Sequence, residues 1–284
     1  MRHTSDSLRD RIDQYYATVP FLFSDAEDFG SLRLFVRNKP GAPYYGGPSH
    51  ARPVAGGFAA IADTDIARVR ARQRQLGVPT AFEWLAETAP TLRARIEAVG
   101  LPVAERPLMV LDRDRPADQR PLSDGVTLRA LTADDPALPA ALALPRLAFA
   151  EEGTAVGSTD PGELSAAARE LVEDGTVAAV RPVIRAGHKT LVAALSSDGT
   201  PLAVGHYHPA KGTTEIGGIG TLPSARRRGL AAAVTTALVG HARDHGVSTV
   251  FLAYADDTVA RIYARLGFRP AGTTLLIAGQ PARS

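Results

Sequence analysis

The second half of the chain is organised around one amphipathic segment between two apolar runs. Apolar residues recur every three or four positions from Leu230 to Ala242, which predicts a helix, and Gly246 is a suitable C-terminal cap. The runs at 213–221 and 247–254 are bounded by turn residues and are typical of strands. The pattern therefore predicts a strand, a loop and a helix that leads into a buried strand.

The remainder of this half adds hairpins and crossing helices. Ser197-Asp198-Gly199 has the composition of a hairpin turn between two alternating runs. Local strand pairs combined with crossing helices predict an α/β fold, of the α+β kind, with a mixed sheet. We predict further strands at 125–131, 190–195, 201–208 and 273–278, and further helices at 132–150, 158–175 and 257–266.

A charged, proline-bearing stretch separates this half from the first half. In the first half, Thr80 and Glu83 have the spacing of a capping box, which predicts the start of a helix. We predict domains at 1–115 and 125–284, joined by a linker at 116–124.

The loop between the strand at 213–221 and the long helix contains residues suited to an anion. Gly229 leaves neighbouring backbone N–H groups bare, and the first turn of the following helix has unpaired donors and the positive end of its dipole. Arg226, Arg227 and Arg228 add charge and fork-shaped donors that match phosphate oxygens. The sequence contains neither the Gly-Lys-Ser/Thr loop of ATPases nor a dinucleotide fingerprint.

Composition narrows the classes of function. The formal net charge of the 284 residues is only +2, which does not suit an arginine-rich nucleic-acid binder. Because the chain has no cysteine, a thiol nucleophile and zinc–thiolate sites are excluded. The N-terminus has no apolar signal core, and no apolar run reaches the roughly 18 residues of a membrane span, so we expect a cytoplasmic protein without a membrane partner.

These residues resemble the GNAT superfamily of acyl-CoA-dependent N-acyltransferases over 125–279. The matching motifs are Arg226-x-x-Gly229-x-Ala231 and Tyr263-x-x-Leu266-Gly267-Phe268, in the family's order of elements. The resemblance implies a GNAT-like fold and acetyl-CoA as cofactor. It implies that the cofactor is bound by Ile219, Gly220, Thr221, Arg226, Arg227, Arg228, Gly229, Leu230, Ala231 and Asp256.

The first half carries a faint repeat of this domain. Gly100 follows Ile96 at the same distance as Gly267 follows Tyr263, and an apolar run comes after each glycine. The first half lacks an Arg-x-x-Gly-x-Gly/Ala loop and has only small and apolar residues, at 59–62, at the corresponding offset. We interpret it as a degenerate GNAT-like copy in tandem; an unrelated α/β extension is the alternative.

Acyl transfer to an amine needs a base for the amine's proton and an acid for the departing thiolate. The resemblance implies Glu215 as base and Tyr263 as acid. Glu151 and Glu152 are the alternative bases, and because they lie where the family builds its acceptor pocket, we assign both to substrate binding. Asp256 stands where the family often has asparagine, and an aspartate cannot donate an amide N–H.

Glycines inside the strand at 213–221 are a further signal. Gly217, Gly218 and Gly220 weaken strand pairing and mark a bulge or the close approach of another backbone. The resemblance implies that this strand splays from its neighbour and that the pantetheine arm pairs with the exposed edge. His206 and His208 share one strand face, and because no third ligand accompanies them, we predict no metal site.

We predict an N-acetyltransferase that moves an acetyl group from acetyl-CoA to a primary amine by direct attack in a ternary complex. The alternative is a catalytically silent acyl-CoA-binding sensor or scaffold. The acceptor is open between aminoglycoside, polyamine, amino acid, peptide and protein lysine. We expect a monomer or homodimer with no nucleic-acid partner.

Overall fold

The computed structural model describes residues 7–38, 49–54, 61–111, 122, 124–151, 153–159, 161–254 and 257–277. The chain forms two compact units. Unit 1 comprises Met1–Val110, Ala253–Asp257 and Arg269–Arg283, and unit 2 comprises Leu111–Leu252 and Thr258–Phe268. The predicted second domain, 125–284, therefore differs at its C-terminal end, which lies in unit 1. Of the predicted linker, 116–124, only Leu122 and Asp124 are described.

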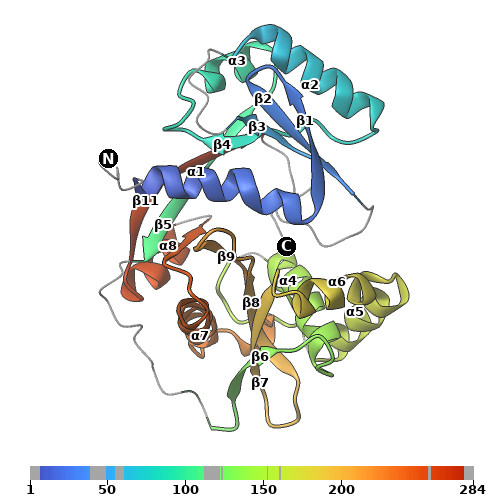
Figure 1. Cartoon of the computed structure of the whole chain (residues 1–284). Coiled ribbons are helices and arrows are strands. Elements are labelled where there is room, and N and C mark those ends of the chain that lie inside the picture. Colours follow the sequence, from blue (N-terminus) through green and yellow to red (C-terminus); the bar gives the residue numbers. More distant parts are fainter. Residues whose placement is uncertain are drawn as a thin grey trace. The chain divides into compact units, whose positions relative to one another are not determined.

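The described residues of unit 1 form three helices, a short 3-10 helix and two groups of strands (Figure 1). The strand order is β1-β2-β3 in one group and β4-β11-β5 in the other, and a parallel bridge between Ala51 and Phe82 links β3 to the segment that enters β4. Its elements are α1 (Leu8–Thr18), η1 (Val19–Leu22), β1 (Ser24–Phe29), β2 (Leu32–Arg37), β3 (Ala51–Pro53), α2 (Asp63–Gln75), β4 (Glu83–Leu85), α3 (Leu92–Ala98), β5 (Val103–Leu111) and β11 (Phe268–Ile277).

The apolar core of unit 1 explains why it includes the last strand of the chain. β11 pairs antiparallel with β4, with Leu275 opposite Trp84. Leu275 and Ile277 join Phe82 and Trp84 in one buried cluster. Because these side chains from the C-terminal end fill the core of unit 1, β11 is part of that unit.

The prediction that a helix starts at Thr80 is wrong. Residues 83–85 form β4 instead, and Phe82 and Trp84 are fully buried in the apolar cluster that includes Leu92 of α3. The local capping-box spacing is overridden because the burial of two large aromatic side chains outweighs a cap that contributes about 1 kcal/mol.

Unit 2 is a mixed sheet with helices on both faces (Figure 1). The strand order is β10-β9-β8-β7-β6, with β10 parallel to β9 and the other pairs antiparallel. Its elements are β6 (Thr127–Leu131), α4 (Leu138–Ala150), α5 (Pro161–Glu173), α6 (Thr176–Arg185), β7 (Thr190–Leu195), β8 (Pro201–Tyr207), β9 (Thr213–Thr221), η2 (Pro223–Ala225), α7 (Leu230–Asp244), β10 (Thr249–Ala253) and α8 (Asp257–Arg265).

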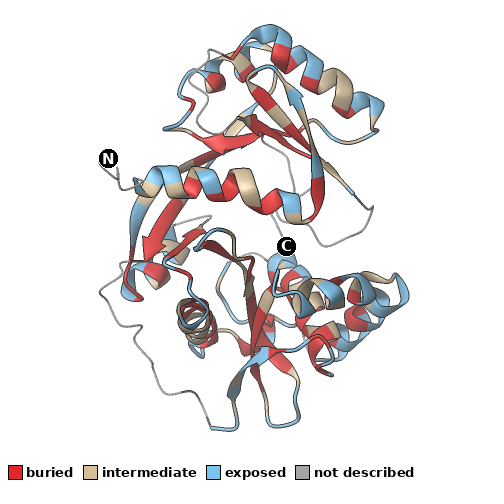
Figure 2. Ribbon diagram, in the orientation of Figure 1, coloured by how far each residue is buried: buried red, intermediate tan, exposed pale blue. Residues whose placement is uncertain are grey.

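Two glycines show which helix covers which face of this sheet. A Cβ at Gly220 would lie 3.1 Å from Ala148 and Leu144 of α4, whereas a Cβ at Gly205 would lie 2.8 Å from Leu238 of α7. The central strands are accordingly buried along most of their length (Figure 2). Residues on the two faces of β8 and β9 therefore point either toward α4 or toward α7.

The two halves of the chain repeat one order of elements. In the first half, three antiparallel strands, β1 to β3, are followed by α2, β4, α3 and β5; in the second half, β7 to β9 are followed by α7, β10, α8 and β11. Both α2 and α7 end at a glycine of positive φ, Gly77 or Gly246, and the next residue, Val78 or Val247, donates a backbone hydrogen bond back into the helix. This shared order and shared cap support the tandem arrangement.

Candidate active site

The loop between β9 and α7 presents backbone donors at the start of a helix. Arg227 and Gly229 both have positive φ, 66° and 74°, so the chain makes a left-handed turn directly before α7. Within the described part of the chain, no side chain caps this helix start, and its first turn has no acidic residue. A Cβ at Gly229 would have no atom within 4 Å among the described residues. The turn and the bare helix start therefore fit an anion such as a diphosphate.

The three arginines of the loop do different things. Arg227 and Arg228 are exposed beside the turn. Arg226 instead donates from Nη2 to the carbonyls of Ala148 and Glu151, at 2.8 Å each, and from Nη1 to that of Ala155 at 3.1 Å. Its guanidinium thus closes the C-terminal end of α4 with three of its five N–H donors, so the side chain that the sequence analysis assigned to phosphate binding is largely engaged within unit 2.

The segment after α4 is folded onto this loop. The backbone N–H of Gly157 donates to the carbonyl of Pro223 at 3.0 Å, and a Cβ at Gly157 would lie 1.8 Å from Glu151 Oε2. Glu151 Oε1 accepts hydrogen bonds from the backbone and the hydroxyl of Thr159. Gly157 is a structural requirement that the sequence analysis missed.

Glu151 is poorly placed to act as the base. The hydroxyl and backbone N–H of Thr159, and then the charge of Arg226, hold the pKa of Glu151 below its usual range. Its side chain closes a loop, which is a positioning role. Glu152, the other predicted residue of this pair, lies outside the described residues, as does Asp256.

β9 splays from β10 beyond Ile216. The parallel pairing of the two strands covers only Thr213 to Ile216 of β9, opposite Thr249 to Leu252. On its other side, β9 continues to pair with β8 as far as Thr221. Residues 217–221 of β9, which include the predicted cofactor residues Ile219, Gly220 and Thr221, thus lie at a sheet edge facing away from β8.

The glycines of β9 form the predicted bulge. The register between β8 and β9 shifts between Val204 and His206, and Gly218 has φ of 61°. A Cβ at Gly218 would lie 2.6 Å from the His206 ring, and Gly220 packs against α4. These positions require glycine for a left-handed turn and for two close approaches.

Glu215 is buried near the end of the paired part of β9. Glu215 is 6% exposed, and it is paired with Phe251 of β10. The register on the other side, with Tyr207 opposite Ile216 and Ala210 opposite Thr213, sets Glu215 opposite His208. A carboxylate is therefore present just before the bulge.

Tyr263 lies on α8 of unit 2. It is 8% exposed, and its ring packs edge-on against Phe268 with the ring centroids 5.9 Å apart. Burial raises the pKa of Tyr263 to about 12, so its hydroxyl keeps its proton at neutral pH. This is the protonation state that a general acid requires.

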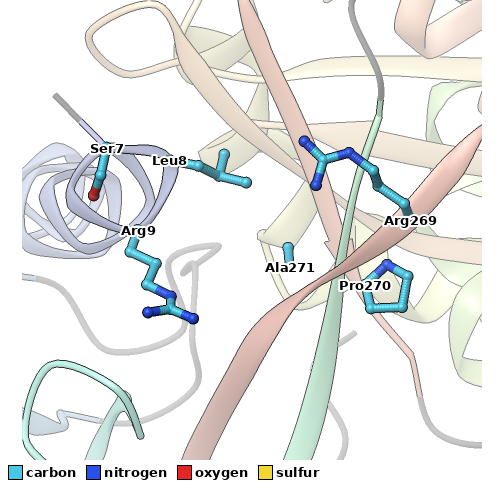
Figure 3. A pocket seen from close by; sticks show the side chains of 6 residues that line it. All are labelled: Ser7, Leu8, Arg9, Arg269, Pro270 and Ala271. Carbon is cyan, nitrogen blue, oxygen red and sulfur yellow. The ribbon is translucent and has the colours of Figure 1, made fainter. Parts of the chain in front are cut away.

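A pocket of about 390 Å³ in unit 1 is unrelated to these residues (Figure 3). The N-terminus of α1 contributes to it, but the Asp10 carboxylate already accepts hydrogen bonds from the backbone and hydroxyl of Ser7 there. The pocket is lined by Ser7, Leu8, Arg9, Arg269, Pro270 and Ala271.

Within the described ranges, no group of three or more His, Asp or Glu side chains is arranged to hold a metal ion. Among the same residues, no helix has the length and apolar character needed to cross a bilayer.

Comparison with known proteins agrees with this architecture. The model of the acetyltransferase (GNAT) family matches residues 163–268. A GCN5-related N-acetyltransferase from Kribbella flavida shares 20% identity, with a TM-score of 0.70 over 96% of this chain and 97% of that one. A tandem GNAT protein from the clavulanic acid biosynthesis pathway shares 17% identity, with a TM-score of 0.54 over 88% of this chain and 79% of that one.

A search of curated proteins found no match. The chain has the GNAT fold, and residues 163–268 match the model of the acetyltransferase (GNAT) family. The predicted fold class and family resemblance are thereby confirmed.

Proposed function

We propose that unit 2 is an N-acetyltransferase that moves an acetyl group from acetyl-CoA to a primary amine by direct attack in a ternary complex. The main support is the uncapped start of α7 after the left-handed turn at Arg227 to Gly229. The GNAT family match supports acyl transfer in general.

The residues of the β9–α7 segment fit coenzyme A. Backbone N–H groups from Arg228 to Ala231 and the side chains of Arg227 and Arg228 would hold the diphosphate. The β9 edge at Ile219 to Thr221 would pair with the pantetheine arm. When bound, acetyl-CoA supplies an activated thioester.

The side chains of unit 2 then have separate roles. Glu215 accepts the proton that the amine must lose before its nitrogen can form the new amide bond. Tyr263 holds a proton on its hydroxyl for the sulfur that leaves. Backbone N–H groups near the bulge stabilise the charge that develops on the carbonyl oxygen.

The test combines binding with turnover. We expect calorimetry to show binding of CoA, and a thiol-release assay with acetyl-CoA and a panel of amines to show turnover. Glu215→Gln should lower kcat by about 100-fold with CoA affinity unchanged. CoA binding without turnover on any amine would indicate the silent binding module, and failure to bind CoA would overturn both readings.

A further inference from the structure

Unit 2 contains a cluster of three basic side chains, two of them buried and one half-buried, that the roles above do not use. Thr190 pairs with Tyr207, so Lys189 stands opposite His208. His206 and His208 are two residues apart on one strand, and their ring centroids are 5.5 Å apart. Lys189, His206 and His208, which we call the basic cluster, therefore share one face of the sheet.

This face is the one toward α4, and the cluster adjoins the proposed reaction site. Val204, on the same face of β8, pairs with Gly220, which packs on α4. The His206 ring lies against the glycines of the bulge, and the register places Glu215 directly beyond His208. A row of Lys189, His208 and Glu215 thus crosses three strands, over about 10 Å.

The histidines are held neutral and in place. His208 Nδ1 lies 2.7 Å from the carbonyl of His188, and because a carbonyl can only accept, this nitrogen donates. Burial, followed by the nearby charge of Lys189, holds the pKa of both His206 and His208 well below 6.5. The positive charge of the cluster at neutral pH therefore resides on Lys189.

Lys189 is a buried cation. It is 8% exposed, and burial alone lowers its pKa to about 8, with no carboxylate acting against the shift. No ion pair of Lys189 with an acid occurs among the described residues. Burying a charged group without a counter-ion is unfavourable, so its presence beside a reaction site points to an anionic ligand.

We propose that Lys189, flanked by His206 and His208, binds a carboxylate of the acceptor, so that the acceptor is an amino acid or a similar compound carrying both a primary amine and a carboxylate. This inference rests on the proposed function. The amine end lies toward Glu215 and the carboxylate end toward Lys189. Polyamines and aminoglycosides are disfavoured, because their additional positive charges would be repelled by Lys189.

The first test compares matched acceptors in the thiol-release assay. The probes are the common amino acids, their carboxamides, putrescine and kanamycin, each assayed with wild type and with Lys189→Met. We expect at least one amino acid to exceed its carboxamide in kcat/KM by about 10- to 100-fold, and Lys189→Met to remove this preference while changing carboxamide turnover by less than about threefold.

The chain offers a matched control. Lys211 is exposed in the turn between β8 and β9, so Lys211→Met removes the same charge away from the cluster and should leave the preference intact. Equal turnover of acids and carboxamides by wild type, or an equal loss on both in Lys189→Met, would overturn the inference while leaving the proposed function standing.

If no amine reacts, the binding of reaction products tests the carboxylate site at Lys189 separately from the proposed acetyl transfer. N-acetyl amino acids and N-acetyl amino acid amides can be titrated calorimetrically into the protein with CoA present. Tighter binding of the acids to wild type, lost in Lys189→Met and kept in Lys211→Met, supports the carboxylate site even if the proposed function fails. Absence of any difference between acids and amides refutes it.

Discussion

The β3–α2 junction of unit 1 and the β9–α7 junction of unit 2 hold the same place in the repeat, yet their helices begin with opposite chemistry. α7 begins after Gly229 and has no acid in its first turn, whereas α2 has Asp63 and Asp65 there. Carboxylates at a helix start occupy the region where a phosphate would bind and repel it. The same scaffold thus has a helix start without acidic side chains in α7 and one with two carboxylates in α2.

The acids of α2 are tied to other parts of unit 1. Asp65 is 8% exposed and accepts from the backbone N–H of Ser31 at 3.2 Å, and Asp63 pairs with Arg95. They stabilise the β1–β2 turn and α3. The prediction that unit 1 is a copy without cofactor stays a prediction, now supported by this charge pattern.

The late helices differ in the same way. Tyr263 of α8 stands four residues before Gly267, and Ile96 of α3 stands four residues before Gly100. Both side chains are buried, and both glycines have positive φ. Unit 1 therefore keeps the packing of this helix but has no hydroxyl at the position of the proposed acid.

The largest expected effect concerns the buried cations of the two units and their contribution to the free energy of unfolding. Arg52 of unit 1 is paired with Asp13, whereas Lys189 of unit 2 has no acidic partner among the described residues. Below pH 8, Lys189 binds its proton in both the folded and the unfolded chain, and its burial costs about 3 kcal/mol. We expect Lys189→Met to raise the free energy of unfolding at pH 7 by about this amount.

This gain should depend on pH in a defined direction. The pKa of Lys189 is about 8 in the folded protein against 10.5 for the ordinary group, so wild type gains stability as pH rises between these values. Urea unfolding at pH 7 and pH 10.5 should show the advantage of Lys189→Met shrinking toward zero. His206 and His208 do not titrate in this range, because their pKa values lie well below 6.5. A difference that does not change with pH would contradict a buried charge.

Removing the hydroxyl of Tyr263 tests the difference between this residue of α8 and Ile96, which holds the corresponding position in α3. Tyr263→Phe should lower kcat by about 100-fold and leave CoA affinity unchanged, because the ring packing is kept and only the proton donor is lost. Single-turnover kinetics and CoA calorimetry measure the two effects separately. Unchanged kcat would remove Tyr263 from the chemistry.

Transferring the acid of α2 to α7 tests the helix starts directly. Asp65 is the third residue of α2, and Ala232 is the third residue of α7. Ala232→Asp should weaken CoA binding by about 10- to 100-fold, even though an acid in the first turn stabilises the helix itself. Ala232→Asn is the uncharged control. Equal affinities of the two variants for CoA would place the diphosphate elsewhere.

The smallest expected effect separates the arginines of the loop. Arg226→Ala should weaken CoA binding only about 3- to 10-fold, because its guanidinium holds α4 and the segment after it in place of phosphate. Arg228→Ala removes an exposed charge and should lower the salt dependence of CoA binding, which Arg226→Ala should leave as in wild type. If instead Arg226→Ala lowers the salt dependence of CoA binding and Arg228→Ala does not, Arg226 is the direct phosphate ligand.

Signals contained within a few residues were predicted well. The turn at 197–199, the cap at Gly246 and the bulge at Gly218 are all present, because each depends on a local backbone conformation that glycine or a turn residue favours. The same reasoning missed α6 (Thr176–Arg185), where the prediction had a helix ending at 175, and misread β4 as a helix start.

The site residues show the same contrast between signals that are local in the sequence and contacts that are not. The sequence indicated the β9–α7 loop and Glu215, but the bonds of Arg226 to α4 join residues more than 70 positions apart. Lys189 carries no motif, and its burial depends on the pairing of β7 with β8 and on the helix that covers them. The sequence offers only a lysine next to an apolar run at this position, which the sequence analysis did not single out.

The sequence by itself indicated the strand, loop, helix and strand order around the long helix of the second half, the glycine turns and the bare start of α7, because these follow from side-chain periodicity and local backbone preference. The tertiary structure alone decided that β11 completes unit 1 and that Arg226 donates hydrogen bonds to the C-terminal end of α4. It also decided that Lys189 is buried beside two neutral histidines. Those outcomes depend on desolvation and on contacts between residues distant in the chain, which no local pattern encodes.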